Sequence, residues 1–256
     1  MTTSISDYKE YRNACMKCAH DAAMFNNFRQ NAQLRQIWEH VTQEQGQKYY
    51  DIVINHQQGE RLLWNAKDND NVGNPTVYDY GYYRRLSPTT LRYIKVALDL
   101  YDIVGEDLFR MNIAEIGGGY GGQSTVIKTS GDYCIYDLPE TCSLISRFTN
   151  SVSPNSNIFC INTLRHSAEH NKYDLIISNY AWSELEYSVQ TEYYDNIIKG
   201  CDFGYITCNY ISELFGVKSW TKQKTIDTFT QDKHATILPE NPLTHTGNMV
   251  VIWTKY

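Results

Sequence analysis

The chain has 256 residues, with 23 Lys and Arg against 29 Asp and Glu, and 42% of its residues are hydrophobic. This length suits one α/β domain with an appended segment. The net charge of −6 argues against a nucleic-acid partner, because phosphate backbones repel an acidic surface. No apolar run has the length of a membrane span, the N-terminus lacks the apolar stretch of a secretory signal, and the seven scattered cysteines are typical of reduced thiols. We therefore expect no membrane partner and a cytoplasmic location.

The first part of the chain, residues 1–107, is predicted to be a helical N-terminal segment that includes a lid on the substrate side. Asp7 is followed three residues later by Glu, a capping-box spacing that predicts a helix to about Phe28. An apolar stripe with helical spacing at 34–41 predicts a second helix, which Gly46 can end.

The stretch 68–83 is polar and contains Gly and Pro, which predicts an ordered loop or the lid itself. Ser87 is a good N-cap, and the proline after it fits a first helical turn, so a helix is predicted from there to Gly105. We expect Arg92 and Lys95 on this helix to be solvated.

From residue 108 to 256 the pattern changes to short apolar stretches that alternate with helical ones. The first five stretches form βα units, which predicts a parallel sheet. About ten residues without a helical pattern join the last two, which predicts a hairpin whose final strand is antiparallel. The predicted strands are 112–116, 133–136, 157–161, 173–178, 204–208, 235–238 and 249–254.

The strongest local signal is the sequence EIGGGYGGQS, in which an apolar strand containing Glu115 leads into a glycine turn and then a helix. Glycines let the backbone approach a ligand closely, and a helix N-terminus directs free N–H groups at the same place. Gly117, Gly119 and Gly122 satisfy G-x-G-x-x-G, which by itself fits more than one nucleotide cofactor. Asp137 ends the second strand, twenty residues beyond Gly117, where it can accept hydrogen bonds from ribose hydroxyls.

Two features favour S-adenosylmethionine over a dinucleotide. Glu115 suits a cationic ammonium group and would face a pyrophosphate unfavourably, and the terminal hairpin departs from the repeated βαβαβ halves of a dinucleotide-binding domain. The predicted fold is α/β, a Rossmann-like class I methyltransferase sheet of seven strands, mostly parallel with the last strand antiparallel, and with an N-terminal helical extension. The S-adenosylmethionine-binding domain is placed at 108–256. The predicted cofactor residues lie in the glycine turn or at strand ends: Glu115, Gly117, Gly118, Gly119, Tyr120, Asp137, Leu138, Asn162, Thr163, Ser178 and Asn179.

Several segments taken together resemble a family of sugar O-methyltransferases. They are SPTTLRYIK from Ser87, AEIGGGYGGQ from Ala114, DLPE from Asp137, SNYAWSEL from Ser178, GYITCNY from Gly204 and PLTH from Pro242. The resemblance covers roughly residues 70–256. It implies S-adenosylmethionine as donor, S-adenosylhomocysteine as product, and as acceptor a small-molecule sugar of glycan biosynthesis: a deoxy, amino or nucleotide-linked sugar. Composition and spacing by themselves do not indicate a sugar, and they leave the oligomeric state open, with a homodimer as one option.

Methyl transfer to a hydroxyl needs alignment of the reactants, and a general base helps. His245, between the last two strands, and Glu184, after the fourth strand, are the predicted catalytic residues. The alternatives are an exposed loop histidine and a carboxylate that stabilises a helix start. The predicted acceptor-binding residues can stack on a ring, hydrogen-bond or bind an anion: Tyr82, Arg84, Tyr180 and Asn209.

No metal site is predicted, because Cys15 and Cys18 have zinc-ligand spacing without a second pair and no carboxylate cluster is evident. Two other functions stay open. One is an NAD-dependent sugar oxidoreductase, against which Glu115 and the hairpin argue. The other is a non-catalytic binding protein with a methyltransferase fold, against which the intact glycine turn and Asp137 argue.

Overall fold

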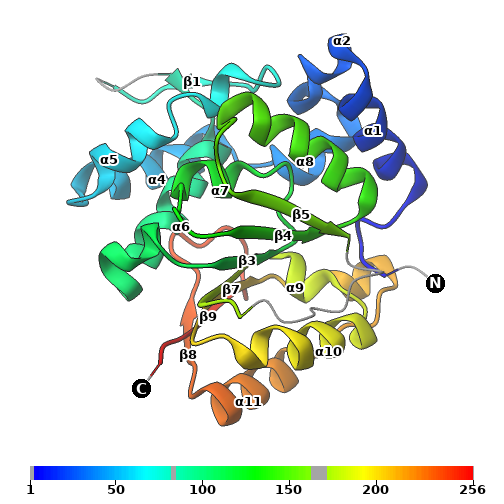
Figure 1. The fold of residues 1–256 in the computed structure, drawn as a ribbon. Helices are drawn as coiled ribbons and strands as arrows, with labels where there is room; N and C mark the ends of the chain where they lie inside the picture. Colours follow the sequence, from blue (N-terminus) through cyan, green and yellow to red (C-terminus); the bar gives the residue numbers. More distant parts are fainter. Residues whose placement is uncertain (1–2, 82–84, 163–171, 256) are drawn as a thin grey trace.

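A seven-stranded sheet runs through the middle of the computed structural model, which describes residues 3–81, 85–162 and 172–255 (Figure 1). Neighbouring strands are parallel from β5 to β7, and β9 is antiparallel to both β7 and β8. The predicted strands are all present with ends shifted by at most two residues, so the predicted fold class is confirmed. In spatial order the strands are β5 (Ile158–Asn162), β4 (Tyr133–Asp137), β3 (Ile113–Ile116), β6 (Leu175–Asn179), β7 (Phe203–Cys208), β9 (Met249–Trp253) and β8 (Thr236–Pro239).

The central strands are apolar because both faces of the sheet are covered. In β3, Ile113 packs into one hydrophobic core, whereas Ala114 and Ile116 pack into a second core on the opposite face. Helices α6 (Pro88–Val104), α7 (Gly122–Ile127) and α8 (Pro139–Val152) contribute to the first core. Helices α9 (Ala181–Glu184), α10 (Tyr187–Asn196) and α11 (Lys222–Lys233) contribute to the second.

The N-terminal helices extend the first core, since α1 packs on α8 and α4 packs on α6. Residue 107 therefore marks a change of secondary structure, and one hydrophobic core continues across it. Within the described residues, no helix combines the length and apolarity that crossing a bilayer requires. The N-terminal elements are α1 (Lys9–His20), α2 (Ala22–Phe25), α3 (Ala32–Trp38), α4 (Gln43–Asn55), α5 (Gly59–Asn65) and the small antiparallel pair β1 (Tyr78–Asp79) and β2 (Arg85–Leu86).

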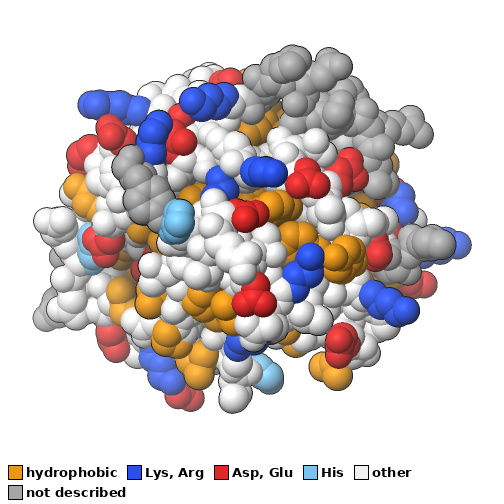
Figure 2. All heavy atoms as spheres, turned by 90° about the horizontal axis from the view of Figure 1, so that it is seen from below, with side chains coloured by type: hydrophobic (Ala, Val, Ile, Leu, Met, Phe, Trp, Pro, Cys, Tyr) orange, Lys and Arg blue, Asp and Glu red, His pale blue; other side chains and the backbone are white. Residues whose placement is uncertain are grey.

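Short 3-10 helices complete the described chain, at Phe28–Gln30, Asn69–Asn71, Gly105–Phe109, Ile198–Gly200 and Ser212–Phe215. Figure 2 views the molecule from the side on which α10 and α11 lie in Figure 1. On that face the Lys and Arg side chains are interspersed with Asp and Glu and do not gather into one patch.

The first predicted helix is wrong at both ends. The helix begins after Tyr8, and no side chain caps it. Asp7 does not cap the helix, because its carboxylate accepts hydrogen bonds from the backbone N–H (3.1 Å) and the hydroxyl (2.9 Å) of Thr3. The helix stops at His20, and Asp21 caps the next helix by accepting a hydrogen bond from the backbone of Met24.

Gly46 was predicted to end a helix, and this is also wrong. It lies inside α4, whose start is a capping box formed by Thr42 and Gln45. A Cβ atom at Gly46 would lie 2.2 Å from the hydroxyl oxygen of Tyr80. Glycine is therefore required here by close packing and not by a helix end.

The predicted helix after Ser87 is confirmed, with its hydroxyl accepting a hydrogen bond from the Thr90 backbone (3.1 Å) and its end at Gly105. The expectation that Arg92 and Lys95 are solvated is wrong, because these side chains are only 8% and 7% exposed. Helix α6 lies between α4 and the sheet, so most of its surface is enclosed.

Candidate active site

The glycine turn between β3 and α7 forms one wall of a cavity. Gly117 and Gly119 have positive φ angles of +73° and +59°, which favour glycine. A Cβ atom at Gly117 would lie 2.1 Å from Cβ of Ala181, and one at Gly118 would lie 2.4 Å from Cγ2 of Ile135. The turn therefore requires glycines, and they present bare backbone to the cavity.

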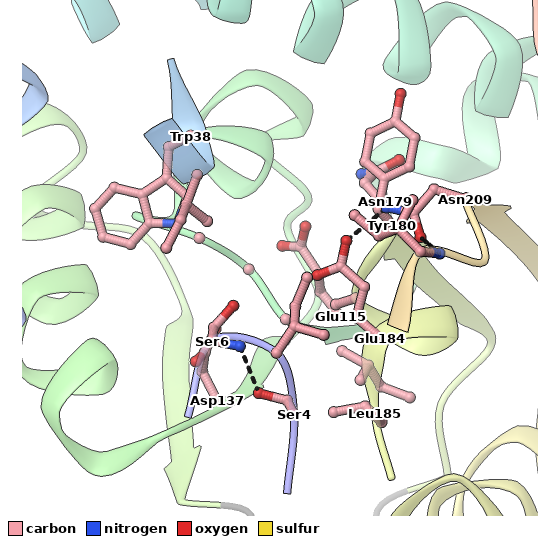
Figure 3. A pocket seen from close by; sticks show the side chains of 18 of the residues that line it. Ser4, Ser6, Trp38, Glu115, Asp137, Asn179, Tyr180, Glu184, Leu185 and Asn209 are labelled. Atoms are coloured by element: carbon pink, nitrogen blue, oxygen red, sulfur yellow. Dashed lines mark hydrogen bonds between the residues drawn. The ribbon is translucent and has the colours of Figure 1, made fainter. Parts of the chain in front are cut away.

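The cavity has a volume of about 810 Å³, within the range of ligand pockets. It lies beyond the carboxyl ends of β3, β4, β6 and β7, and Figure 3 shows side chains from these strand ends around it. The N-terminal residues cover another side, since the backbone N–H of Ile5 donates to the carbonyl of Glu184 (3.2 Å) and that of Glu186 donates to the carbonyl of Thr3 (2.9 Å).

Two carboxyl groups line the cavity beside the glycine turn. Glu115 is 2% exposed and accepts a hydrogen bond from the Tyr133 hydroxyl (2.9 Å), and burial raises its pKa to about 8. Asp137 accepts a hydrogen bond from the backbone N–H of Leu138 (2.8 Å), and desolvation raises its pKa to about 7. Among the described side chains no cation pairs with either group. A ligand cation or hydroxyl would supply the missing partners.

A third carboxyl group that lines the cavity is that of Glu184, which follows β6 and is drawn beside Asn209 in Figure 3. Its Oε1 accepts a hydrogen bond from the side-chain amide of Asn209 (2.6 Å), and Asn209 in turn accepts one from the Ser183 hydroxyl (3.0 Å). Desolvation raises the pKa of Glu184 to about 7, against the lowering effect of Asn209. A carboxyl group with a pKa near neutrality can exchange a proton with a reacting group.

Tyr180 extends this wall from a strained backbone position with a φ of +69°. Its hydroxyl donates a hydrogen bond to the buried carboxylate of Glu240, which also accepts from the hydroxyl of Thr244 (2.6 Å) and the amide of Asn248 (2.9 Å). Glu240 thus holds together Tyr180 and the connection between β8 and β9.

No model of a known protein family matches this sequence, and no curated protein matches it as a relative. The structure is similar to geranyl diphosphate C-methyltransferase from Streptomyces coelicolor in complex with Mg²⁺, geranyl diphosphate and S-adenosyl-L-homocysteine. That match has a TM-score of 0.50 at 10% identity and covers 79% of this chain and 85% of the other. Magnesium protoporphyrin IX methyltransferase from Synechocystis with bound SAH matches with a TM-score of 0.49 at 11% identity, over 65% and 83% of the two chains.

The strand order and the single antiparallel strand β9, together with the first of these likenesses, decide the fold. The chain has the class I methyltransferase fold. A dinucleotide-binding fold would repeat its βαβαβ half and lack the terminal hairpin.

Within this methyltransferase fold, many of the predicted residues lie around one cavity. They come from the turn, from the ends of β4, β6 and β7, and from the β8–β9 connection: Glu115, Gly117, Gly118, Gly119, Asp137, Leu138, Asn179, Tyr180, Glu184, Asn209 and His245. His245 is exposed at the cavity rim, and its Nδ1 lies 3.0 Å from the carbonyl oxygen of Thr246.

Three predicted cofactor residues do not line the cavity. Tyr120 is fully buried on the core side of the turn, where its ring packs edge-on to Phe148 with centroids 4.9 Å apart. Ser178 lies one residue before the cavity-lining Asn179 in β6 and is buried. Its hydroxyl donates a hydrogen bond to the carbonyl of Ile116 (3.0 Å). Asn162 pairs in register with Asp137 at the end of β5, outside the cavity wall.

Other predicted residues fall outside the described part of the chain: Tyr82, Arg84 and Thr163. The described part of the predicted lid, 68–81, does not line the cavity. Asp70 attaches this segment to the start of α6 by accepting hydrogen bonds from the backbone of Ser87 (2.6 Å) and the hydroxyl of Thr90 (2.7 Å). Among the described residues, no group of three or more His, Cys, Asp and Glu is placed to hold a metal ion.

Sequence reasoning missed part of the cavity wall. Thr3–Ser6, Trp38, His40 and Arg92 all line it. The short polar N-terminus carries no pattern that could have revealed this. Arg92 could have been found, because the helix that contains it is apolar around most of its circumference, and such helices are usually buried.

Proposed function

We propose that this chain transfers a methyl group from S-adenosylmethionine to a hydroxyl group of a sugar, free or nucleotide-linked. The proposal for the donor is supported by the class I fold and by the acids beside the glycine turn. The proposal for a sugar acceptor is supported by the sequence resemblance alone.

The observation that carries the donor proposal is the pair Glu115 and Asp137 at the glycine turn. Glu115 is buried without a cationic partner among the described side chains, so a ligand ammonium group would stabilise its ionised form. Asp137 ends the neighbouring strand, where a carboxylate can accept two hydrogen bonds from a ribose diol. When bound, S-adenosylmethionine would supply a methyl group on a positively charged sulfur: the acceptor oxygen forms a bond to the methyl carbon as the carbon–sulfur bond breaks, and S-adenosylhomocysteine leaves as a neutral thioether.

Glu184 is the proposed general base. Its Oε1 is held by Asn209, and the side chain lines the cavity, so the carboxylate is positioned to take the proton of an acceptor hydroxyl as that oxygen attacks. A pKa of about 7 leaves a substantial ionised fraction at neutral pH. His245 stays a second candidate, but its exposed ring is less well protected from water than Glu184.

Calorimetric titration with S-adenosylhomocysteine tests the donor site. We expect micromolar binding by the wild type and a loss of at least about tenfold in Asp137→Ala, because about 1.4 kcal/mol of hydrogen bonding is removed. Glu184→Gln is the matched control, since it also removes a cavity carboxylate and should retain binding. NAD is titrated in parallel.

Heat from NAD without heat from S-adenosylhomocysteine would contradict the proposal and favour a sugar oxidoreductase. If neither ligand gives a heat of binding, a non-catalytic binding protein would be favoured. Equal losses in Asp137→Ala and Glu184→Gln would show that the assigned roles of the two acids are wrong.

A further inference from the structure

The guanidinium group of Arg92 is a buried positive charge that lines the cavity. The side chain is 8% exposed, and no carboxylate of the described residues lies within ion-pair distance of it. Its Nη1 lies 3.3 Å from Nε2 of His40, and its Nε is shielded from solvent without a hydrogen-bond partner. A buried charge without a counter-ion is unfavourable, so this arrangement needs an explanation.

His40 does not neutralise Arg92. Its Nδ1 lies 2.8 Å from the carbonyl oxygen of Ile37, which fixes Nδ1 as the donor and leaves Nε2 to accept from Arg92. His40 lines the cavity and is exposed to solvent there, while desolvation of its ring and the charge of Arg92 lower its pKa to about 4. His40 is therefore neutral at pH 7 and orients the guanidinium group.

The other buried cations have carboxylate partners. Arg29 pairs with Glu39 (2.6 Å) and Asp70 (2.8 Å), and Lys95, on the same helix as Arg92, pairs with Asp99 (2.5 Å). Glu240 borders a small hollow together with Arg92, but its oxygens accept hydrogen bonds from Tyr180, Thr244 and Asn248. Arg92 contacts only neutral groups, His40 and the rings of Tyr93 and Tyr180, and so differs from Arg29 and Lys95 in lacking a carboxylate partner within the described chain.

A second unsatisfied donor lies on the same wall. The side-chain nitrogen of Asn179, at the end of β6, is buried without a hydrogen-bond partner, and Asn179 lines the cavity together with Arg92. The two residues also border a separate hollow of about 10 Å³, which has room for about one water molecule. A charged group can therefore reach them only from the large cavity.

We propose that Arg92, assisted by Asn179, binds an anionic group of the methyl acceptor, a phosphate or a carboxylate. Guanidinium groups bind both anions through charge-assisted hydrogen bonds. The inference rests on the proposed function and narrows its acceptor to an acidic or phosphorylated sugar. The anion would stabilise Arg92 in the complex, so that acceptors without a negative charge bind weakly.

Inorganic phosphate is the first probe, with the melting temperature measured at constant ionic strength against chloride. We expect phosphate to raise the melting temperature of the wild type by several degrees, Arg92→Met to lose this rise and Arg92→Lys to retain part of it. Arg110→Met is the matched control, because it removes one exposed positive charge and should respond like the wild type. A wild type that phosphate does not stabilise, or an Arg92→Met variant that responds equally, would overturn the proposal.

Glucose 6-phosphate, glucuronate and glucose then distinguish the two anions in the same assay. A larger shift with glucose 6-phosphate supports a phosphorylated acceptor, and a larger shift with glucuronate supports a carboxylated one. Equal shifts with all three would overturn the anion proposal. The phosphate measurement needs no donor ligand, so its failure is distinguishable from a failure to bind S-adenosylhomocysteine, which would contradict the methyltransferase proposal instead.

Discussion

Arg29 and Arg92 are both buried, and they differ in whether the described chain supplies a carboxylate partner. Arg29 pairs with Glu39 and Asp70 and donates a further hydrogen bond to the Ser87 hydroxyl (2.7 Å), which ties the first helices to the start of α6. Arg92 lines the cavity with a neutral histidine and an unsatisfied nitrogen. The charge of Arg29 stabilises the fold through its own ion pairs. The charge of Arg92 lacks a counter-ion among the described residues of the fold, and we expect a ligand to supply one.

Two acids beside the cavity resemble Arg92, because they too lack a partner of opposite charge in the described part of the chain. Glu115 and Asp137 are enclosed without cationic partners among the described side chains, and desolvation raises the pKa of each. We expect unpaired charges at the cavity, such as that of Arg92, to act in ligand binding and catalysis, and paired buried charges, such as that of Arg29, to act in stability.

The largest effect is expected for Glu184→Gln in a methylation assay. Removing a general base lowers kcat by about 10²–10⁴-fold. The kcat values of both proteins should be compared at saturating donor and acceptor, with His245→Gln as the second variant. A normal kcat in Glu184→Gln together with a large loss in His245→Gln would transfer the role of base to His245.

A loss of stability is expected next, for Arg29→Met. Removing one partner of a buried ion pair costs about 3–5 kcal/mol, because Glu39 and Asp70 are left buried without their cation. Arg92→Met removes a charge that has no such partner, so its free energy of unfolding should stay within about 1 kcal/mol of the wild type or increase. Urea unfolding of both variants measures this, and similar losses in both would remove the distinction between the two arginines.

The smallest effect is expected in the pH dependence of stability. Glu115, Asp137 and Glu184 have raised pKa values in the folded protein, of about 8, 7 and 7. Between pH 6.5 and 8 the unfolded chain has already released these protons, so the folded state binds more of them and stability falls as pH rises. The fall should be about 3 kcal/mol, the sum of about 1.6 kcal/mol from Glu115 and about 0.8 kcal/mol from each of Asp137 and Glu184.

Urea unfolding of the ligand-free protein at pH 6.5 and pH 8 gives this slope, and Glu115→Gln should reduce it. The lower limit of pH 6.5 keeps the opposing contribution of His40 small, because its pKa is lowered in the folded protein and about half of the imidazole is already deprotonated in the unfolded chain at that pH. A stability that rises over this interval would show that the cavity acids are ionised in the free protein.

The periodicity of the sequence predicted the sheet well, because strands buried on both faces are mostly apolar and the glycine turn after β3 is a distinct local pattern. Prediction failed where a residue has two possible uses. Gly46 can end a helix or allow Tyr80 to pack closely, and only the tertiary contact distinguishes these. Asp7 can cap a helix or bind the N-terminal backbone, and here it binds the backbone of Thr3.

Local spacing was therefore sufficient to predict the strands and their directions, the glycine turn and the acids beside it, since parallel strands end at the same edge of a sheet. Tertiary contacts were needed to show which strand-end residues reach the cavity: Ser178 and Tyr120 point into the core, whereas Asn179 and Tyr180 do not. They also showed that Arg92 lacks a carboxylate partner among the residues described, because such a partner can come from a distant segment, as Asp70 does for Arg29. Local patterns encode the conformation of a segment, but they do not encode which charges its neighbours will neutralise.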